Sequence, residues 1–169
     1  HKNMEFLLGG LKIEDQAFSF AEKIMDLTKF LIDVLDVHPP ANNNARKVKV
    51  TYHDPCHLAN AQGIKEQPRE LLRRIPGVEL VEMKEANRCC GGSGTYSLTH
   101  YDISMKILDR KIDNAMLTGA GKIATCCPSC TMQLRYGVSR SKWQADVVHP
   151  VVLLSQSYHQ AKTLKTQGK

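Results

Sequence analysis

The chain has 169 residues, of which 42% are hydrophobic and 6% aromatic, and its formal net charge is +6. This is enough for one globular domain with a hydrophobic core, but no apolar run approaches the roughly 18–20 residues that span a bilayer. No basic stripe interleaves with aromatic residues, which argues against nucleic-acid binding. No signal peptide is recognisable, and the chain does not begin with Met, so we expect a piece of a longer protein.

Residues 14–37 have the strongest helical pattern in the chain. Their apolar side chains recur at alternating steps of four and three, which places them on one helix face. These are Phe20, Ile24, Leu27, Leu31 and Val34. The segment His38-Pro39-Pro40 ends this helix, and residues 41–46 have the composition of a linker. We predict a helix within residues 1–40, packed along one apolar seam and joined to a preceding unit, followed by a cysteine-rich domain at residues 41–169.

After the linker, short β-branched segments alternate with helical patterns. The predicted strands are 47–52, 78–83, 122–125 and 146–149. The predicted helices include Leu71–Arg73, Asp102–Leu117 and Val151–Tyr158, and a further helix that begins at Pro128 after Cys127. Such alternation is typical of an α/β fold, so we predict a parallel sheet of about four strands flanked by helices.

Cysteines follow the predicted strands. Cys56 comes shortly after the first strand, the pair Cys89-Cys90 follows the second through a short loop, and Cys126-Cys127 follows the third directly. In open α/β sheets, ligands bind outside the carboxyl ends of the strands. We therefore expect these cysteines to lie at the carboxyl ends of the strands, along one edge of the sheet.

The cysteine spacing is C-x32-C-C-G-G, then thirty-six residues, then C-P-S-C. Thiolates bind soft transition metals and iron–sulfur clusters, and cysteines without a secretory signal more often bind metal or do redox chemistry than form structural disulfides. A structural zinc site usually has two C-x2-C pairs, whereas adjacent cysteines such as Cys89 and Cys90 are poorly placed to bind one ion together. The spacing favours an iron–sulfur cluster.

Two alternatives stay open. A zinc ion held by four of the six cysteines would make this a zinc-binding assembly module. The segment Cys127-Pro128-Ser129-Cys130, between a strand and a helix, also has the layout of a dithiol active site, with the first thiol near a helix N-terminus. The dithiol hypothesis leaves Cys56 and the pair Cys89-Cys90 without a role.

Other polar residues lie near the predicted site. His53, His57 and His149 are close to strand ends, where a structural or supporting role is favoured over ligation. Tyr96 and Ser97 follow the glycines, and they either hydrogen-bond to sulfur or pack the loop.

Two further groups have predicted locations. Met105 and Met116 are expected in the core from their helical spacing. The cluster of Arg69, Arg73 and Arg74 is expected on the surface.

The five-cysteine pattern resembles that of the CCG cysteine-rich domain family, which includes the cysteine-rich subunit of heterodisulfide reductase. The stretches YHDPCHLANAQGIKEQPRELLRRIPGVELVEM, CCGGSGTYSL and VVHPVVLL resemble the C-terminal part of glycolate oxidase iron–sulfur subunits within that family. The similarity covers roughly residues 14–158.

The resemblance implies a non-catalytic, electron-transferring part of a flavin-linked 2-hydroxy-acid oxidase or dehydrogenase complex of the glycolate or lactate type. It implies flavin-containing dehydrogenase subunits and a ferredoxin-like region as partners, and a place in the cytoplasm or on the inner face of the membrane. A thiol–disulfide redox domain like that of heterodisulfide reductase is the alternative. The implied cofactor is a cluster of the 4Fe-4S type, cubane or non-cubane. The residues that the resemblance assigns as ligands are Cys56, Cys89, Cys90, Cys127 and Cys130, with Cys126 as a further possible one.

Overall fold

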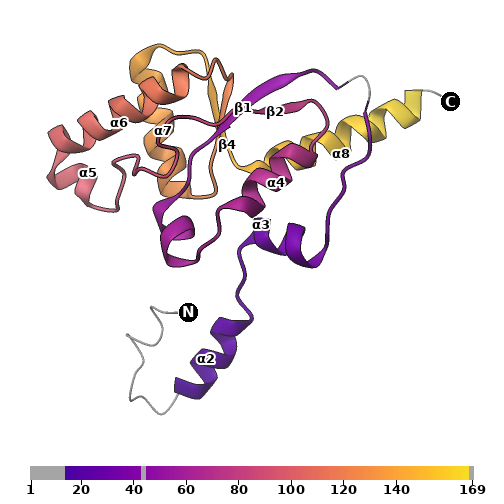
Figure 1. Ribbon diagram of the computed structural model, residues 1–169, viewed down its shortest axis with the longest axis horizontal. Coiled ribbons are helices and arrows are strands. Elements are labelled where there is room, and N and C mark those ends of the chain that lie inside the picture. Colours follow the sequence, from indigo (N-terminus) through magenta and orange to yellow (C-terminus); the bar gives the residue numbers. More distant parts are fainter. Residues whose placement is uncertain (1–13, 43–44, 168–169) are drawn as a thin grey trace.

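A computed structural model of the protein describes residues 14–42 and 45–167 and shows one parallel sheet (Figure 1). The strand order is β2-β1-β3-β4, and all three strand pairs are parallel. The strands are β1 (Val48–Tyr52), β2 (Val78–Leu80), β3 (Lys122–Ala124) and β4 (Asp146–Val148). The predicted α/β fold with helices flanking a parallel sheet is confirmed, although the second strand is shorter than expected.

Helices cover both faces of this sheet. The helices α6 (Tyr101–Met116) and α7 (Pro128–Ser141) cover one face, and α4 (Glu66–Arg74) and α8 (Pro150–Gln167) cover the other. We call the two hydrophobic clusters the α6/α7 core and the α4/α8 core. The α6/α7 core contains Met83, Ala86, Cys90, Met105, Leu108, Ile112, Ala115, Ile123, Cys130, Leu134, Val138 and Val147. The α4/α8 core contains Val50, Tyr52, Leu71, Leu72, Ile75, Ala124, Leu153 and Leu154.

Strand alternation explains how one sheet supplies both cores. Ile123 and Val147 belong to the α6/α7 core, whereas Ala124, the next residue along β3, belongs to the α4/α8 core. Val148 also packs against the α4/α8 core. Successive side chains of a strand point to opposite faces, so a sheet buried on both sides requires apolar residues at consecutive positions.

The close approach of α6 and α7 depends on a glycine. A Cβ atom at Gly137 would lie 2.6 Å from the Ile112 Cγ1 atom and 2.8 Å from the Leu108 Cδ1 atom. Both distances are shorter than carbon–carbon van der Waals contact. Only glycine therefore lets the two helices pack at this separation.

The predicted continuous helix over residues 14–37 is wrong. The structure has α2 (Glu14–Glu22), α3 (Leu27–Lys29) and a π-helical turn, η1 (Phe30–Val34), with a break before Asp26. The Asp26 carboxylate accepts hydrogen bonds from the backbone N–H groups of Thr28 at 2.8 Å and Lys29 at 3.2 Å. An Asp side chain that caps a new helix in this way competes with continuation of the preceding one.

The predicted apolar seam is also largely wrong. Phe20, Ile24, Leu27 and Val34 are exposed, and only Leu31 packs against the α4/α8 core. Figure 1 shows α2 projecting away from the sheet. The helical period was therefore present in the sequence without a buried surface to match it. Residues 1–13 and 43–44, which belong to the predicted N-terminal segment and linker, lie outside the described residues.

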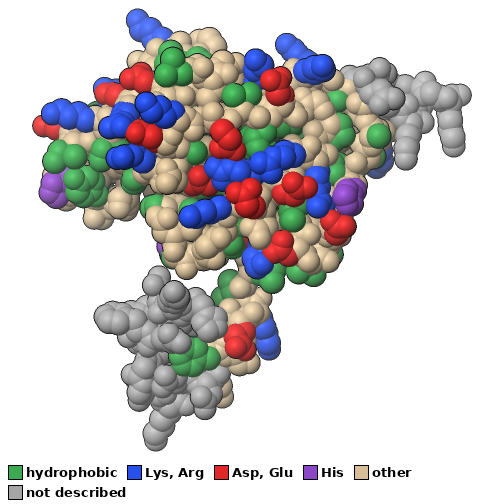
Figure 2. Space-filling view, in the orientation of Figure 1, with side chains coloured by type: hydrophobic (Ala, Val, Ile, Leu, Met, Phe, Trp, Pro, Cys, Tyr) green, Lys and Arg blue, Asp and Glu red, His purple; other side chains and the backbone are tan. Residues whose placement is uncertain are grey.

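The remaining predictions for helices are mixed. Met105 is buried as expected, but Met116 is 41% exposed because it is the last residue of α6. The final helix α8 begins one residue earlier and extends to Gln167. On the face shown in Figure 2, Lys and Arg side chains are interspersed with Asp and Glu. No helix in the described part of the chain is long and apolar enough to cross a membrane.

Candidate metal centre

The strand order creates a switch point between β1 and β3. The chain leaves β1 to form β2 on one side, and β3 pairs with β1 on the other side. In open α/β sheets such a point opens a crevice at the carboxyl ends of the two strands. The segment from His53 to Cys56 follows β1, and the segment from Thr125 to Cys130 follows β3. Two of the predicted cysteine-bearing segments thus flank this crevice.

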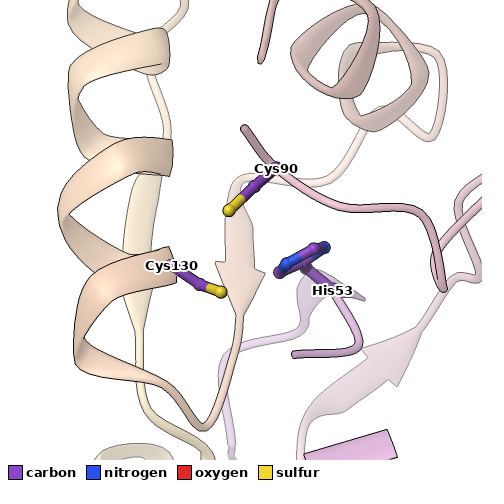
Figure 3. A group of neighbouring side chains, drawn as sticks. All are labelled: His53, Cys90 and Cys130. Carbon is purple, nitrogen blue, oxygen red and sulfur yellow. The ribbon is translucent and has the colours of Figure 1, made fainter. Parts of the chain in front are cut away.

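Three side chains from separate elements converge at this point. His53 follows β1, Cys90 lies in the loop before the short helix α5 (Tyr96–Thr99), and Cys130 lies in the first turn of α7. The possible ligand atoms of these three residues all lie within 4.8 Å of one another, and all three residues are buried (Figure 3). This is a compact set of one nitrogen and two sulfur donors.

The first turn of α7 has the predicted geometry. Cys127 is the N-cap with an extended backbone, at φ −126° and ψ 125°, and Pro128 is the first helical residue. The Cys127 carbonyl accepts a hydrogen bond from the Thr131 N–H at 2.8 Å. Cys130 therefore lies near the positive end of the helix dipole, which favours a negative group such as a thiolate.

Cys126 and Cys127 point to opposite sides of the sheet. Cys126 packs against the α4/α8 core, where the Tyr52 hydroxyl donates a hydrogen bond to its sulfur at 3.5 Å. Burial raises the pKa of the Cys126 thiol to about 12. Cys127 instead packs against the α6/α7 core, which contains Cys90 and Cys130. The alternation of side chains beyond the end of β3 thus separates Cys126 from the other thiols.

The adjacent cysteines Cys89 and Cys90 form a short chain of thiols with Cys130. The Sγ atoms of Cys90 and Cys130 lie within 4.8 Å of each other, and Cys89 is the neighbour of Cys90 in the chain. Interaction with the Cys130 thiol, followed by burial, raises the pKa of Cys90 to about 12, and interaction with the Cys90 thiol, followed by burial, raises the pKa of Cys89. Without metal the thiols of Cys89 and Cys90 hold their protons, so metal binding must release them.

Gly91 fastens this pair of cysteines to α6. Its φ is +88°, and a Cβ atom here would lie 2.5 Å from the Ser104 backbone oxygen. The Ser104 hydroxyl donates a hydrogen bond to the Gly91 carbonyl at 2.8 Å and accepts one from the Gln133 amide at 3.1 Å. The loop with the adjacent cysteines is therefore tied to both α6 and α7, and only glycine fits the contact.

The imidazole of His53 is fully buried and has no hydrogen-bond partner on either ring nitrogen. Burial lowers its pKa to about 3, and the positive charge of Lys111 acts in the same direction. The carbonyl of Ala86 is near the ring but outside hydrogen-bonding geometry. His53 is thus a neutral imidazole, which is the form that binds metals.

Lys111 is a buried cation next to the thiols. Its ammonium donates hydrogen bonds to the backbone carbonyls of Glu85 at 2.5 Å and Ala86 at 3.3 Å. Burial lowers its pKa, while the nearby Cys90 thiol is the largest opposing influence. Lys111 therefore holds the loop that precedes the two cysteines and brings positive charge to a site of thiolates. Sequence periodicity gave no sign of this role.

The prediction that Arg69 is exposed is wrong. Its guanidinium is buried and binds the Asp54 carboxylate through two hydrogen bonds, of 2.7 and 2.8 Å, and the Glu82 carboxylate through two more, of 2.7 and 3.2 Å. It also lies 4.9 Å from the centre of the Tyr52 ring. Arg69 thus anchors the turn between β1 and Cys56. Arg73 is exposed as predicted.

Arg74 is the third member of this arginine cluster. Its side chain is 19% exposed and pairs with Asp36 and Glu70. The pair with Asp36 connects α4 to the segment that follows η1.

The structure distributes the five predicted cysteine ligands unevenly. Cys90 and Cys130 are buried together, Cys89 and Cys127 are partly buried beside them, and Cys56 is exposed. Ligation by the whole set of five stays a prediction. All six cysteines are free thiols.

The other candidate residues are exposed or have partners other than these thiols. Tyr96 stacks on His100, and Ser97 donates a hydrogen bond to the Gly94 carbonyl. His57 is exposed, and His149 accepts a hydrogen bond from the Val151 N–H at 3.2 Å. Among the three histidines near strand ends, His53 alone has its ring in the group with Cys90 and Cys130. Its position immediately after a buried strand was the signal in the sequence.

The donors present suit a thiophilic metal. Neutral imidazole and cysteine thiolates bind zinc, iron and iron–sulfur clusters, whereas calcium and magnesium require oxygen ligands. His53, with two unpartnered nitrogens, and the thiols of Cys90 and Cys130 are donors of this kind, and they lie close together. Fold and site together define an α/β domain with a cysteine-rich candidate metal centre at the switch point of its sheet.

The chain belongs to the CCG cysteine-rich domain family, because the family model described as "Cysteine-rich domain" matches residues 50–135. It is 36% identical over 145 residues to the "Probable glycolate oxidase iron-sulfur subunit" of Bacillus subtilis (strain 168). The aligned residues cover 85% of this chain and 32% of that protein. It is 33% identical over 138 residues to a subunit of the dihydromethanophenazine:CoB--CoM heterodisulfide reductase of Methanosarcina acetivorans, covering 80% of this chain and 34% of that one.

A third relative is the "Lactate utilization protein A" of an Exiguobacterium species, which is 31% identical over 147 residues. That alignment covers 86% of this chain and 59% of the relative. The chain therefore spans about a third of the first two relatives and somewhat more than half of the third.

Proposed function

We propose that this chain is an iron–sulfur electron-transfer domain of a flavin-linked 2-hydroxy-acid oxidase or dehydrogenase complex of the glycolate or lactate type. The observation that carries the proposal is the convergence of Cys90, Cys130 and their neighbouring thiols at the switch point of a sheet in a chain of the CCG family. The names of the relatives, an iron–sulfur subunit of glycolate oxidase and a lactate utilization protein, support the substrate class.

The proposed ligands are Cys56, Cys89, Cys90, Cys127 and Cys130, which would hold a cluster of the 4Fe-4S type. Such a cluster supplies one-electron transfer when bound. The chain's own contribution is to bury the sulfurs, tie down the loop of Cys89 and Cys90 through Gly91, and place the positive charge of Lys111 nearby. Hydrogen bonding, burial and net charge are the properties that set the potential of a cluster.

The proposed electron donors and acceptors are flavin-containing dehydrogenase subunits and a ferredoxin-like region of the same or a partner chain. We place residues 1–40 as a connection to a preceding unit and residues 41–169 as the cluster-binding domain. The exposed apolar side chains of Phe20, Ile24 and Leu27 support this arrangement, because they offer a surface that the described residues leave uncovered. The proposed location is the cytoplasm or the inner face of the membrane.

Zinc binding is the second candidate, and one observation favours it. The three donors of His53, Cys90 and Cys130 lie within 4.8 Å of one another, which is close enough for one ion to draw them together. In that case the domain would serve assembly rather than electron transfer. The dithiol alternative is less well supported, because Cys130 is buried and its sulfur lies within 4.8 Å of that of Cys90.

The test is anaerobic purification and reconstitution of the 169-residue chain, followed by iron, sulfide and zinc analysis and an absorption spectrum. We expect stoichiometric iron and sulfide with a broad visible charge-transfer absorption that bleaches on reduction. Stoichiometric zinc with no sulfide after reconstitution would overturn the proposed function in favour of the zinc module.

A further inference from the structure

His53 is a buried polar residue that the cysteine pattern does not explain. Its side chain is 0% exposed, and neither Nδ1 nor Nε2 has a hydrogen-bond partner in the described structure. Its backbone N–H donates to the Ala124 carbonyl at 2.9 Å, which holds the residue beside the end of β3. The backbone is thus anchored, while the ring is left without a polar contact.

Such an arrangement is unfavourable for a histidine with a purely structural role. A buried polar group without a partner loses its hydrogen bonds to water and forms no others, which destabilises the folded state. Structural histidines in protein cores therefore bind a carbonyl, a carboxylate or a hydroxyl. The ring of His53 instead faces the thiols of Cys90 and Cys130 (Figure 3).

The same side of the sheet has two more unpartnered hydroxyl groups. The Oγ1 atoms of Thr51 and Thr125 are buried without a hydrogen-bond partner, like the nitrogens of His53. Strand alternation places Thr51 and His53 opposite Tyr52, and Thr125 opposite Ala124, so all three side chains are directed to the α6/α7 side. These unpartnered atoms therefore gather on the side of the sheet that contains Cys90 and Cys130.

We propose that His53 is a nitrogen ligand of the metal that Cys90 and Cys130 bind, so that the centre has mixed histidine and cysteine ligation. The inference rests on the proposed function and adds a ligand to its cysteine set. Donors that bind one tetrahedral ion at about 2.0–2.3 Å each are about 3.3–3.8 Å apart. The three donors here lie within 4.8 Å of one another, so each needs to move by less than about 1 Å to reach one metal atom.

Mixed ligation has a consequence for electron transfer. Imidazole binds as a neutral group, whereas each thiolate adds a negative charge, and replacement of thiolate by imidazole raises the reduction potential of an iron–sulfur centre. Buried Lys111 acts in the same direction through its charge. His53 would thus hold the centre at a higher potential than an all-cysteine site in the same crevice.

The test compares the full chain with the variants His53→Ala and His53→Gln, and with His57→Ala as the matched control. His57 is an exposed histidine only four positions away, so its removal should leave the centre unchanged. Each protein is expressed with ¹⁵N-labelled histidine and is then reconstituted anaerobically with iron and sulfide. Circular dichroism first checks that each variant is folded. If His53→Ala does not fold, the comparison uses His53→Gln, which replaces the ring with a polar amide.

The readouts are pulsed electron paramagnetic resonance and a potentiometric titration. We expect a strong hyperfine coupling to one histidine nitrogen in the wild type and in His57→Ala. The folded His53 variant should lack this coupling and retain less than half of the iron. A wild-type spectrum with no directly coordinated nitrogen, or unchanged iron content and potential in a folded His53 variant, would overturn the inference.

A cobalt(II) titration separates this inference from the proposed function. If the wild type takes up no iron and sulfide, the proposed function fails, but cobalt(II) still reports on His53 through its visible bands. A loss of at least tenfold in cobalt affinity in the His53 variants, and none in His57→Ala, would support His53 as a ligand of a mononuclear site. Equal affinity in all proteins, or no cobalt binding to any of them, would overturn it.

Discussion

The two cores of this domain cover opposite faces of one sheet, yet they satisfy their polar groups in different ways. In the α4/α8 core, Tyr52 hydrogen-bonds to Cys126, and the neighbouring Arg69 is paired with Asp54. The buried atoms without partners belong to Thr51, His53 and Thr125, which strand alternation directs to the α6/α7 side. The polar side chains named on the α4/α8 side therefore have hydrogen-bond partners. The α6/α7 side instead has buried polar atoms without partners, next to several thiols.

The sharpest test of this comparison uses the two neighbouring cysteines after β3. We expect Cys127→Ser to lose most of its iron and sulfide after anaerobic reconstitution, because Cys127 packs on the same core as Cys90 and Cys130. Cys126→Ser should keep wild-type iron content, since its sulfur lies on the other side. Metal analysis and the visible spectrum of the two variants provide the measurement. Equal iron loss in both variants would mean that the two faces are not separated in this way.

The next largest effect is expected from the ion pair that supports the α4/α8 face. Arg69→Leu leaves the buried Asp54 carboxylate unpaired, so it should lower the free energy of unfolding by about 3–5 kcal/mol. Urea denaturation of the metal-free chain measures this change. Exposed Arg73 is the control, and Arg73→Leu should change stability by no more than about 0.5 kcal/mol. Similar losses in both variants would show that Arg69 contributes no more than a surface charge.

A smaller effect is expected where α6 meets α7. Gly137→Ala places a methyl group against Ile112 and Leu108, and this overpacking should cost about 1–3 kcal/mol of unfolding free energy. Gly121 is the matched control, because a Cβ atom there meets no heavy atom within 4 Å. Gly121→Ala should be nearly neutral in the same denaturation experiment. A neutral Gly137→Ala would mean that the α6/α7 core is loosely packed.

The smallest expected effect is a difference in cysteine reactivity, which is measured on the unmutated chain. In the metal-free chain, Cys126 should be alkylated at least about tenfold more slowly at pH 8 than exposed Cys56, because burial raises its thiol pKa to about 12 and thiolate is the reactive form. The reactivity of Cys126 should continue to rise as the pH approaches 12. Mass spectrometry of timed digests gives both rates. Equal rates at pH 8 would indicate that the Cys126 side of the sheet opens readily.

Much of the site was accessible from the sequence because short-range signals specify it. Alternating β-branched segments predicted the parallel sheet, and Pro128 after Cys127 predicted the start of α7. Each of these signals involves neighbours in the chain or a strict period of side chains, and such local preferences survive in the folded protein.

The N-terminal segment shows where local signals fail. A helical period through Phe20, Ile24 and Leu27 predicted one helix, but a capping interaction at Asp26 divides it and the apolar side chains remain exposed. Periodicity reports which residues share a face and not whether another surface covers that face.

By itself, the sequence determined the fold class, the order of the strands and helices, and the cysteine framework, since these depend on composition and periods of two and 3.6 residues. Only the tertiary structure decided that Arg69 is buried, that Cys126 lies apart from Cys127, and that His53 faces Cys90 and Cys130. These three results depend on which side of the sheet a residue occupies and on what packs against it there. Both properties arise from contacts between segments that are distant in the chain, and no local pattern encodes them.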